Sequence, residues 1–301
     1  RLHAVASTSA ERATAFAGEY GAPFAFSRYA DLVECPGLDV VYIATPHVLH
    51  SEHALLCLEH GLPVLCEKPF AMNLPEARHL VYTAHKNRVF LMEALWTRFI
   101  PAVDHALNLV AEGAIGDLHT VKSDFGFKMP FDPHSRLYNK ALGGGSLLDI
   151  GIYPALLNLL LFGKPQPGDI QAAATFTPTN VDDSCAFTFQ YPGNKLALSH
   201  CTLAATTPVE ANLYGTEGTI YLHPRWHHTQ KLTVSRYDGR DEQKREIDLP
   251  YSGWGYAFEA AHVMDCLEKE RLESDRLPLD FTLDLVETLD TIREKIGLEY
   301  S

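Results

Sequence analysis

The sequence predicts an α/β protein in which a doubly wound parallel sheet is followed by an α+β domain with a large, mainly antiparallel sheet. Over the first third of the chain, apolar strand-like runs alternate with segments of helical period, as a parallel sheet with crossover helices requires. From Asp117 onward, strand-like runs follow one another, with turn signals such as Pro192-Gly193-Asn194 between them. A chain of 301 residues is long enough for two domains. We expect one domain over residues 1–96 and the other over 97–301.

The elements of the first domain follow from apolar runs and helix signals. Ser9 can cap a helix that runs to Tyr20, after a first short strand at 2–7. The run from Leu38 to Thr45 has apolar residues on both faces, which is typical of a strand buried in a parallel sheet. The further elements that we predict are strands at 64–70 and 89–92 and helices at 51–60 and 75–86.

The second domain is predicted to expose one face of its sheet. Its predicted strands are 117–128, 170–177, 184–191, 195–203, 209–215, 218–223, 231–237 and 244–249. Helices at 146–161, 254–270 and 280–296 should cover one face and leave the other for a second subunit. Along one strand, Leu196, Leu198 and His200 alternate with Ala197, Ser199 and Cys201, so one of these two sets should lie in a homodimer interface.

Composition favours a soluble globular protein. Apolar residues make up 46% of the chain and charged residues 21%, and 25 basic against 38 acidic residues give a net charge of −13. This charge repels nucleic acid and anionic membranes, so we expect neither as a partner. No apolar run reaches the roughly 18 residues that a membrane span needs. The six cysteines lack metal-type spacing, which predicts free thiols in a reducing cytoplasm.

Glu67-Lys68-Pro69 is the most informative motif. The apolar strand that begins at Val64 delivers a carboxylate and an amine side by side, and Pro69 ends the strand pairing. Open α/β sheets bind ligands at the carboxyl ends of their strands, where Lys68 would lie. The triplet alone also occurs as solvated surface charge. However, Thr45-Pro46-His47 ends the neighbouring strand, so two polar strand ends should lie together.

These motifs resemble the family of NAD(P)-dependent oxidoreductases typified by glucose-fructose oxidoreductase and inositol dehydrogenase (Gfo/Idh/MocA). The resemblance is closest to the subgroup of dimeric dihydrodiol dehydrogenase and NADP-dependent D-xylose dehydrogenase, and it extends from residue 1 to about 298. The motifs that narrow it are Leu91–Phe99, Gly116-Asp117-Leu118, Gly143-Gly144-Gly145 and Leu148–Tyr153. The resemblance implies a Rossmann-type first domain and hydride transfer between NADP(H) and a small sugar, polyol or trans-dihydrodiol.

The resemblance also implies three catalytic residues, Lys68, Asp149 and Tyr153. Asp149 and Tyr153 are four residues apart near the start of a predicted helix, so they should share a face. Spacing alone also allows a helix-dipole partner and a half-buried tyrosine. In the family, the position of Tyr153 is an acid/base and Lys68 lies beside it, while Asp149 would orient the substrate. Many relatives have histidine in place of Tyr153, which favours the dihydrodiol and xylose dehydrogenase branch.

The cofactor is expected to be NADP rather than NAD. An acidic residue after the second strand would bind the ribose hydroxyls of NAD, whereas Ser7-Thr8-Ser9 and Arg12 offer hydroxyls and a guanidinium. The residues that the resemblance implies in cofactor binding are Ser7, Thr8, Arg12, Thr45, Pro46, His47, His50, Glu67, Lys68, Trp96 and Arg98. For Arg98, an ion pair with a carboxylate is the alternative.

The implied substrate-binding residues are Trp96, Phe125, Asp149, Tyr153 and Trp254. The flat aromatic faces suit sugar rings or aromatic diols, although each aromatic residue is equally compatible with ordinary core packing. His47, His50 and His53 have a three-residue spacing but no accompanying ligand set, so we predict no metal site. We expect His227-His228 in a surface turn without a chemical role.

The Gly-rich loop that holds the pyrophosphate in such domains is not found in this sequence. The chain opens on what resembles the second strand, so about 25–30 residues with the first strand, loop and helix are expected to be absent. We expect weak cofactor binding, or none, without them. Two other functions stay open from the sequence: an NAD-dependent glycosidase of the same fold, and a non-catalytic sugar-binding or partner protein.

Overall fold

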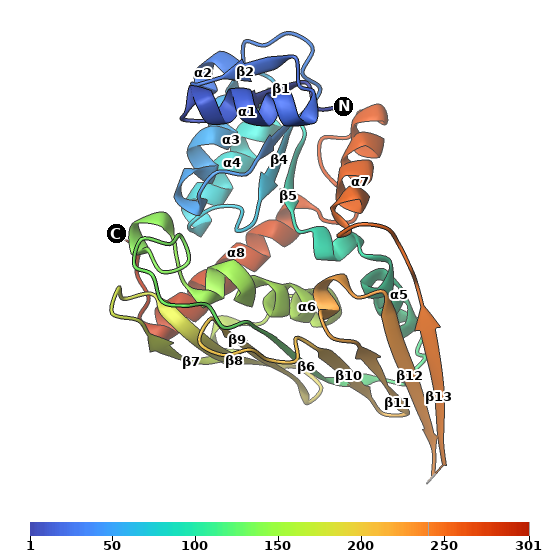
Figure 1. The fold of residues 1–301 in the computed structure, drawn as a ribbon. Helices are drawn as coiled ribbons and strands as arrows, with labels where there is room; N and C mark the ends of the chain where they lie inside the picture. The colour runs from blue at the N-terminus through green and yellow to red at the C-terminus, as the bar shows by residue number, and fades with distance from the viewer. Residues whose placement is uncertain (240, 301) are drawn as a thin grey trace. The chain divides into compact units, whose positions relative to one another are not determined.

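The computed structural model describes residues 1–239 and 241–300, which form two compact units (Figure 1). One unit contains Arg1–Ala94 and Val263–Leu279, and the other contains Leu95–His262 and Asp280–Ser301. We predicted two domains that meet between residues 96 and 97, each formed by one continuous segment. In the structure, residues 263–279 belong to the first unit instead. There the Leu91 N–H donates a hydrogen bond of 3.2 Å to the Leu272 carbonyl, which ties this late segment to an early strand.

The first unit alternates parallel strands and helices, as predicted. Its strands form two sheets, and among the described residues no strand joins them: β1 (Ala4–Ala6) pairs with β2 (Phe24–Phe26), and β3 (Val41–Ile43), β4 (Val64–Glu67) and β5 (Leu91–Ala94) pair in that order. The helices are α1 (Ala10–Tyr20), α2 (Tyr29–Leu32), α3 (His50–Glu59) and α4 (Leu74–Asn87). Since Ile43 pairs with Cys66, the carboxyl ends of β3 and β4 lie side by side.

The second unit is built on an eight-stranded mixed sheet in the order β13-β12-β11-β10-β6-β9-β8-β7. These strands are β6 (Leu118–Gly126), β7 (Ile170–Phe176), β8 (Asp182–Tyr191), β9 (Lys195–Thr202), β10 (Ala211–Gly215), β11 (Gly218–Leu222), β12 (Lys231–Asp238) and β13 (Asp241–Asp248). All neighbours are antiparallel except β6 and β9, which run parallel. The sheet is thus mainly antiparallel, with one parallel pair at its centre.

The helices of the chain's second part include one that the sequence analysis missed. They are α5 (Pro101–Ala111), α6 (Ile152–Phe162), α7 (Tyr256–Glu268) and α8 (Leu279–Ile296), and α5 was not predicted. The predicted helix at 146–161 begins instead with a π-helical turn at Leu147–Gly151, which leads into α6. The unit boundary falls within α7, so this helix does not belong wholly to the sheet domain that we predicted it to cover.

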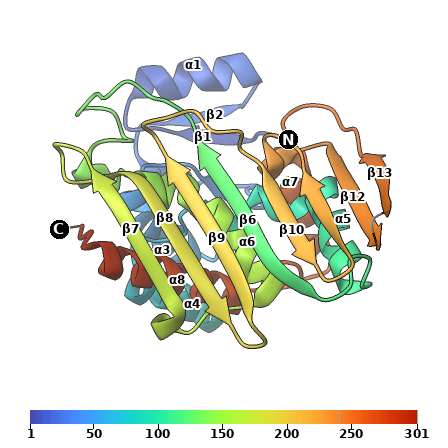
Figure 2. The same cartoon turned by 90° about the horizontal axis from the view of Figure 1, so that it is seen from below.

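One face of the sheet is covered by helices and the other is not. Helix α6 packs on β6 and β9, and α5 packs on β11 and β12. Ala197, Ser199 and Cys201 point to this covered face and are buried. Figure 2 looks onto the opposite face, over which no described helix of this unit lies, and Leu198 is 37% exposed there.

The residues Lys140–Phe162, which include the π-helical turn and α6, are long and apolar enough to span a membrane by length and composition. Of the apolar window in this stretch, 83% is buried inside the structure, as in the core helix of a globular domain. The burial follows from its position against β6 and β9. This stretch is therefore the central core helix of the second unit.

Candidate active site

Some of the predicted cofactor residues lie at the carboxyl ends of β3 and β4 in the first unit. His50, which is 1% exposed, contacts the carbonyl of Thr45 at 2.8 Å through Nε2 and the carbonyl of Pro69 at 2.7 Å through Nδ1. One imidazole thus links the two strand ends. On β4, Glu67 accepts a hydrogen bond from the Lys68 backbone N–H at 3.1 Å and another from the Tyr42 hydroxyl. The Lys68-Pro69 peptide bond is cis.

Hydroxyl and guanidinium groups lie together just after β1. The Arg12 guanidinium donates to the Thr8 hydroxyl at 2.9 Å, and Ser9 caps α1 by accepting from the Arg12 backbone N–H at 3.3 Å. The Ser9 N–H in turn donates to the Ser7 hydroxyl at 3.4 Å. Thr8 and Arg12 are exposed. This segment therefore presents a cation and hydroxyls to solvent at the carboxyl end of β1.

In the second unit, Tyr153 lies in a cluster of aromatic rings. The Trp96 indole N–H donates a hydrogen bond of 3.0 Å to the Tyr153 hydroxyl, and both residues are 5% exposed. The ring centroid of Phe125 lies 5.3 Å from that of Tyr153, and Trp96 stacks on Tyr256 at 4.3 Å. The structure thus brings together three predicted substrate residues, Trp96, Phe125 and Tyr153. Lys68, predicted to act with Tyr153, belongs to the first unit.

His227 and His228 also join this cluster, so our expectation that they lie in a surface turn was wrong. His227 is 7% exposed and stacks on Phe125 at 4.3 Å, and His228 stacks on Trp96 at 5.5 Å. The neighbouring Trp226 is fully buried, and its indole N–H donates to the Asp124 carbonyl at 3.0 Å. That anchor turns the adjacent histidines inward. Trp254, by contrast, is 66% exposed and meets only the edge of the cluster, 6.0 Å from His228.

Asp149 lies on the π-helical turn, is 4% exposed, and forms an ion pair of 2.8 Å with Arg136. Sequence analysis did not single out Arg136, which precedes the turn in an irregular segment without a recognisable motif. The ion pair holds the carboxylate oxygen Oδ1 in one orientation. Arg98 forms an ion pair of 2.8 Å with Asp104, which is the carboxylate alternative considered for it.

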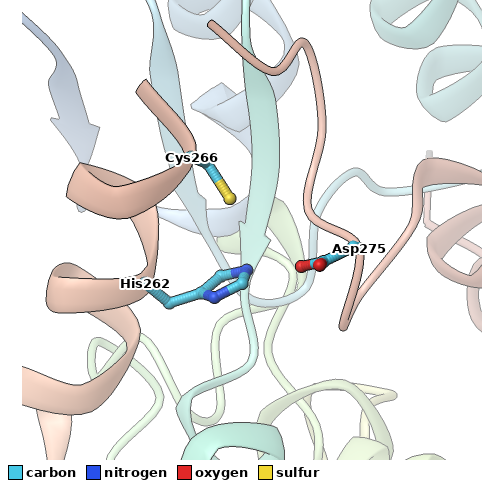
Figure 3. A group of neighbouring side chains, drawn as sticks. All are labelled: His262, Cys266 and Asp275. Carbon is cyan, nitrogen blue, oxygen red and sulfur yellow. The ribbon is translucent and has the colours of Figure 1, made fainter. Parts of the chain in front are cut away.

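The histidines considered as metal ligands, and a second group of possible ligands, have partners within the protein. The Nδ1 atom of His53 lies 3.0 Å from the Thr45 hydroxyl, and both ring nitrogens of His50 contact backbone carbonyl oxygens. The ring nitrogens in these contacts therefore already have partners within the protein. A second group, His262, Cys266 and Asp275, gathers near the end of α7 (Figure 3). There Asp275 pairs with the Arg271 guanidinium at 2.5 Å, and this cation disfavours a metal ion beside it.

The buried histidines of the first unit should make it sensitive to acid. Burial lowers the pKa of His50 below its usual 6.5, against the opposing effect of its two carbonyl contacts, and burial also lowers the pKa of His53. A histidine whose pKa is lower in the folded state stabilises the fold fully above pH 6.5, and this stabilisation is lost as the pH falls, because the unfolded chain takes up protons first.

We predict that His50→Gln reduces the loss of stability between pH 7.5 and 5.5, measured as the shift of the urea midpoint. His79→Gln, at an exposed histidine of α4, is the matched control and should keep the parent's full pH dependence. If His50→Gln and His79→Gln lose stability in parallel with the parent, protonation of His50 does not contribute to acid unfolding.

Comparison with known proteins agrees with this architecture. A family model described as "Oxidoreductase family, NAD-binding Rossmann fold" matches residues 1–95, and one described as "GFO/IDH/MocA C-terminal domain" matches residues 103–221. The mouse trans-1,2-dihydrobenzene-1,2-diol dehydrogenase is 35% identical over 305 residues, which cover 99% of this chain and 89% of that relative.

Two solved structures share the fold. A levoglucosan dehydrogenase in complex with NADH and levoglucosan gives a TM-score of 0.87 at 21% identity, covering 98% of this chain and 88% of that one. A 3-ketoreductase from Actinomadura kijaniata in complex with TDP-benzene and NADP gives 0.83 at 20% identity, covering 98% and 89%. The two family models and the near full-length relative show that the chain belongs to the Gfo/Idh/MocA family of NAD(P)-dependent oxidoreductases.

Proposed function

We propose that this oxidoreductase uses NADP(H) to oxidise or reduce a small sugar, polyol or trans-dihydrodiol, with Tyr153 as the group that exchanges a proton with the reacting oxygen. The observation that carries the proposal is the Trp96–Tyr153 hydrogen bond within the aromatic cluster. The name of the mouse relative supports a dihydrodiol, and that of the levoglucosan dehydrogenase supports a sugar.

The hydrogen bond determines what the Tyr153 phenol can do. A phenolic oxygen accepts hydrogen bonds and donates one. The indole N–H occupies an acceptor position of that oxygen, so this hydrogen bond does not use the phenol's own proton, which is the one that would pass to a substrate oxygen. The same indole N–H stabilises the negative charge that develops when the proton leaves. Tyr153 is thereby suited to both directions of proton exchange.

The other catalytic assignments are part of the same proposal. Lys68 would stabilise the Tyr153 phenolate by its charge. Asp149, whose carboxylate is oriented by Arg136 at 2.8 Å, would orient a substrate hydroxyl. The rings of Trp96, Phe125 and His227 would form the wall against which the apolar face of a sugar or diol ring packs.

The residues of the first unit fit a dinucleotide. Arg12, Thr8 and Ser7 would hold the 2′-phosphate of NADP, since they offer a cation and hydroxyls. Thr45, Pro46, His47, His50 and Glu67 would line the ribose and nicotinamide side, at the strand ends that His50 links. When bound, the nicotinamide supplies hydride transfer. The chain's own residues supply binding, orientation and the proton.

Tyr153→Phe and Lys68→Met should each lower turnover by about a hundredfold or more, the usual scale for losing a positioned proton-transfer group. Steady-state kinetics with NADPH and a panel of sugars and dihydrodiols, on a version extended upstream by a strand and a Gly-rich loop, measures this. Tyr221→Phe, which removes a hydroxyl that bonds to Glu210 on the sheet, is the control and should stay close to the parent. Turnover within about threefold of the parent for either test variant contradicts the assigned role.

NADP should be preferred to NAD by this chain. Arg12→Gln should weaken NADPH binding by about tenfold while leaving NADH binding unchanged, because only NADPH carries the phosphate that the guanidinium would pair with. Ser7→Asp should reverse the preference. Isothermal titration measures both dissociation constants, with Arg28→Gln, at an exposed arginine of the same unit, as control. Equal affinity of the parent for both cofactors would refute the prediction.

We also propose a homodimer in a reducing cytoplasm. The uncovered sheet face carries Leu196, Leu198 and His200, with Tyr214 38% exposed on a nearby strand. Apolar side chains on a broad uncovered sheet face are typical of a protein interface. The six cysteines are free and buried, which agrees with a reducing compartment.

Leu198→Glu should convert the dimer into a monomer of 33.5 kDa, measured by light scattering at micromolar concentration. Burying a carboxylate without a partner opposes association. Tyr82→Glu, which changes an exposed aromatic residue of the first unit, should leave the mass of two chains unchanged. A parent that is monomeric at this concentration contradicts the dimer.

A further inference from the structure

We propose that Asp182 is a positioning residue that fixes Tyr153 and Asp149 by accepting two hydrogen bonds at the start of the π-helical turn. The role of Tyr153 in this inference rests on the proposed function. Asp182 begins β8 and does not touch the reacting atoms itself. Its effect is exerted through the turn that carries Asp149 and leads into Tyr153.

The two hydrogen bonds hold the point at which the chain enters the turn. The Oδ2 atom of Asp182 accepts from the Ser146 hydroxyl at 2.6 Å and from the Leu147 backbone N–H at 2.7 Å. The first N–H groups of a helical segment have no partner within it, so a buried start needs an acceptor from elsewhere. Ser146, Leu147 and Asp182 are all fully buried. Asp182, which lies on the sheet, therefore provides the hydrogen-bond acceptor that a capping residue next to the helix would otherwise provide.

Close packing fixes the turn at both ends. A Cβ on Gly145, whose φ is +125°, would lie 2.2 Å from Oδ1 of Asp182. A Cβ on Gly151 would lie 2.7 Å from the Cys201 sulfur of β9, which is also 3.4 Å from the Ser146 hydroxyl. Glycine at both positions lets the turn approach β8 and β9 closely. The turn thus has little freedom to rotate unless the Asp182 contacts are lost.

The hydrogen-bond acceptor, rather than the charge, is what this position requires. Burial raises the pKa of Asp182 from 3.8 to about 6, against the hydrogen bonds from Ser146 and Leu147, which lower it. The groups that face it are Asp183 and Cys185 of β8, Cys201 of β9, Ser146, Tyr300 and, beyond the Tyr300 ring, Arg293 of α8. Because its pKa is raised, its contribution to stability falls as the pH rises from about 4 through 6.

An asparagine can keep the acceptor without the charge. Asp182→Asn should therefore retain turnover within about threefold and be no less stable than the parent at pH 7, because its amide oxygen accepts both hydrogen bonds. Asp182→Ala should lower kcat by about tenfold or more with little change in KM, because it misplaces Tyr153 while leaving the ring wall in place. Asp183→Ala, at the neighbouring carboxylate, is the matched control and should behave as the parent.

A spectroscopic measurement tests positioning independently of activity. The chain has three tryptophans, so its ¹H–¹⁵N spectrum has three indole signals, and Trp96→Phe identifies the one that reports the bond to Tyr153. The Trp96 signal should shift in Asp182→Ala and stay in place in Asp182→Asn and Asp183→Ala. Ser146→Ala, which removes one of the two hydrogen bonds, gives a smaller shift in the same direction and replaces Asp182→Ala if that variant does not fold.

An unchanged Trp96 signal in Asp182→Ala or Ser146→Ala overturns the proposal. It is also overturned if Asp182→Asn loses as much kcat as Asp182→Ala. A failure of the proposed function has a different pattern. In that case Tyr153→Phe keeps its turnover, whereas the Trp96 signal still responds to Asp182→Ala.

Discussion

The hydrogen bond from the Trp96 indole to the Tyr153 hydroxyl is the contact on which the candidate site of the second unit depends. It joins a short helical turn after β5 to the helix α6, and it lies among rings contributed by β6 and by the segment around His227. Since all of these groups are buried or half-buried, the phenol cannot rotate without disturbing several ring contacts. A fixed position is what the proton-transfer role proposed for Tyr153 requires.

The π-helical turn carries Asp149 and leads directly into α6, which carries Tyr153. The first N–H groups of a helical segment need acceptors from elsewhere, and π-helical turns are frequent at functional sites. Here Asp182 satisfies the start of the turn, Gly145 and Gly151 allow the close approach, and Arg136 holds the carboxylate of Asp149. The contacts that stabilise this segment are thus the same ones that would position the proposed catalytic residues.

The sequence predicted the elements whose signals are local. Apolar runs ending in Thr45 and Glu67 located two parallel strand ends, and the structure places them side by side. The strands of the mixed sheet were found within a few residues because turn residues separate them. Helix α5 was missed although Pro101 occupies its first position, a signal that was available.

What the sequence did not predict depends on contacts between distant segments. His227 is buried because Trp226 is anchored to Asp124, about a hundred residues earlier, which no local pattern reveals. Arg136 and Asp182 become candidate site residues only once their contacts with the π-helical turn are known. The helix pattern at 146–161 does not distinguish a π-helical turn from an α-helical one. The parallel pairing of β6 with β9 is likewise a contact between distant segments that no local pattern predicts.

The central claim is that Trp96 acts on the reaction through Tyr153. A double-mutant cycle of turnover with Trp96→Phe, Tyr153→Phe and the double variant tests it most directly, because Trp96→Phe keeps an aromatic ring for stacking on Tyr256 but removes the indole N–H. The account predicts that the double variant is no slower than Tyr153→Phe alone. If the two losses of turnover multiply instead, the two residues act independently and the claim is contradicted.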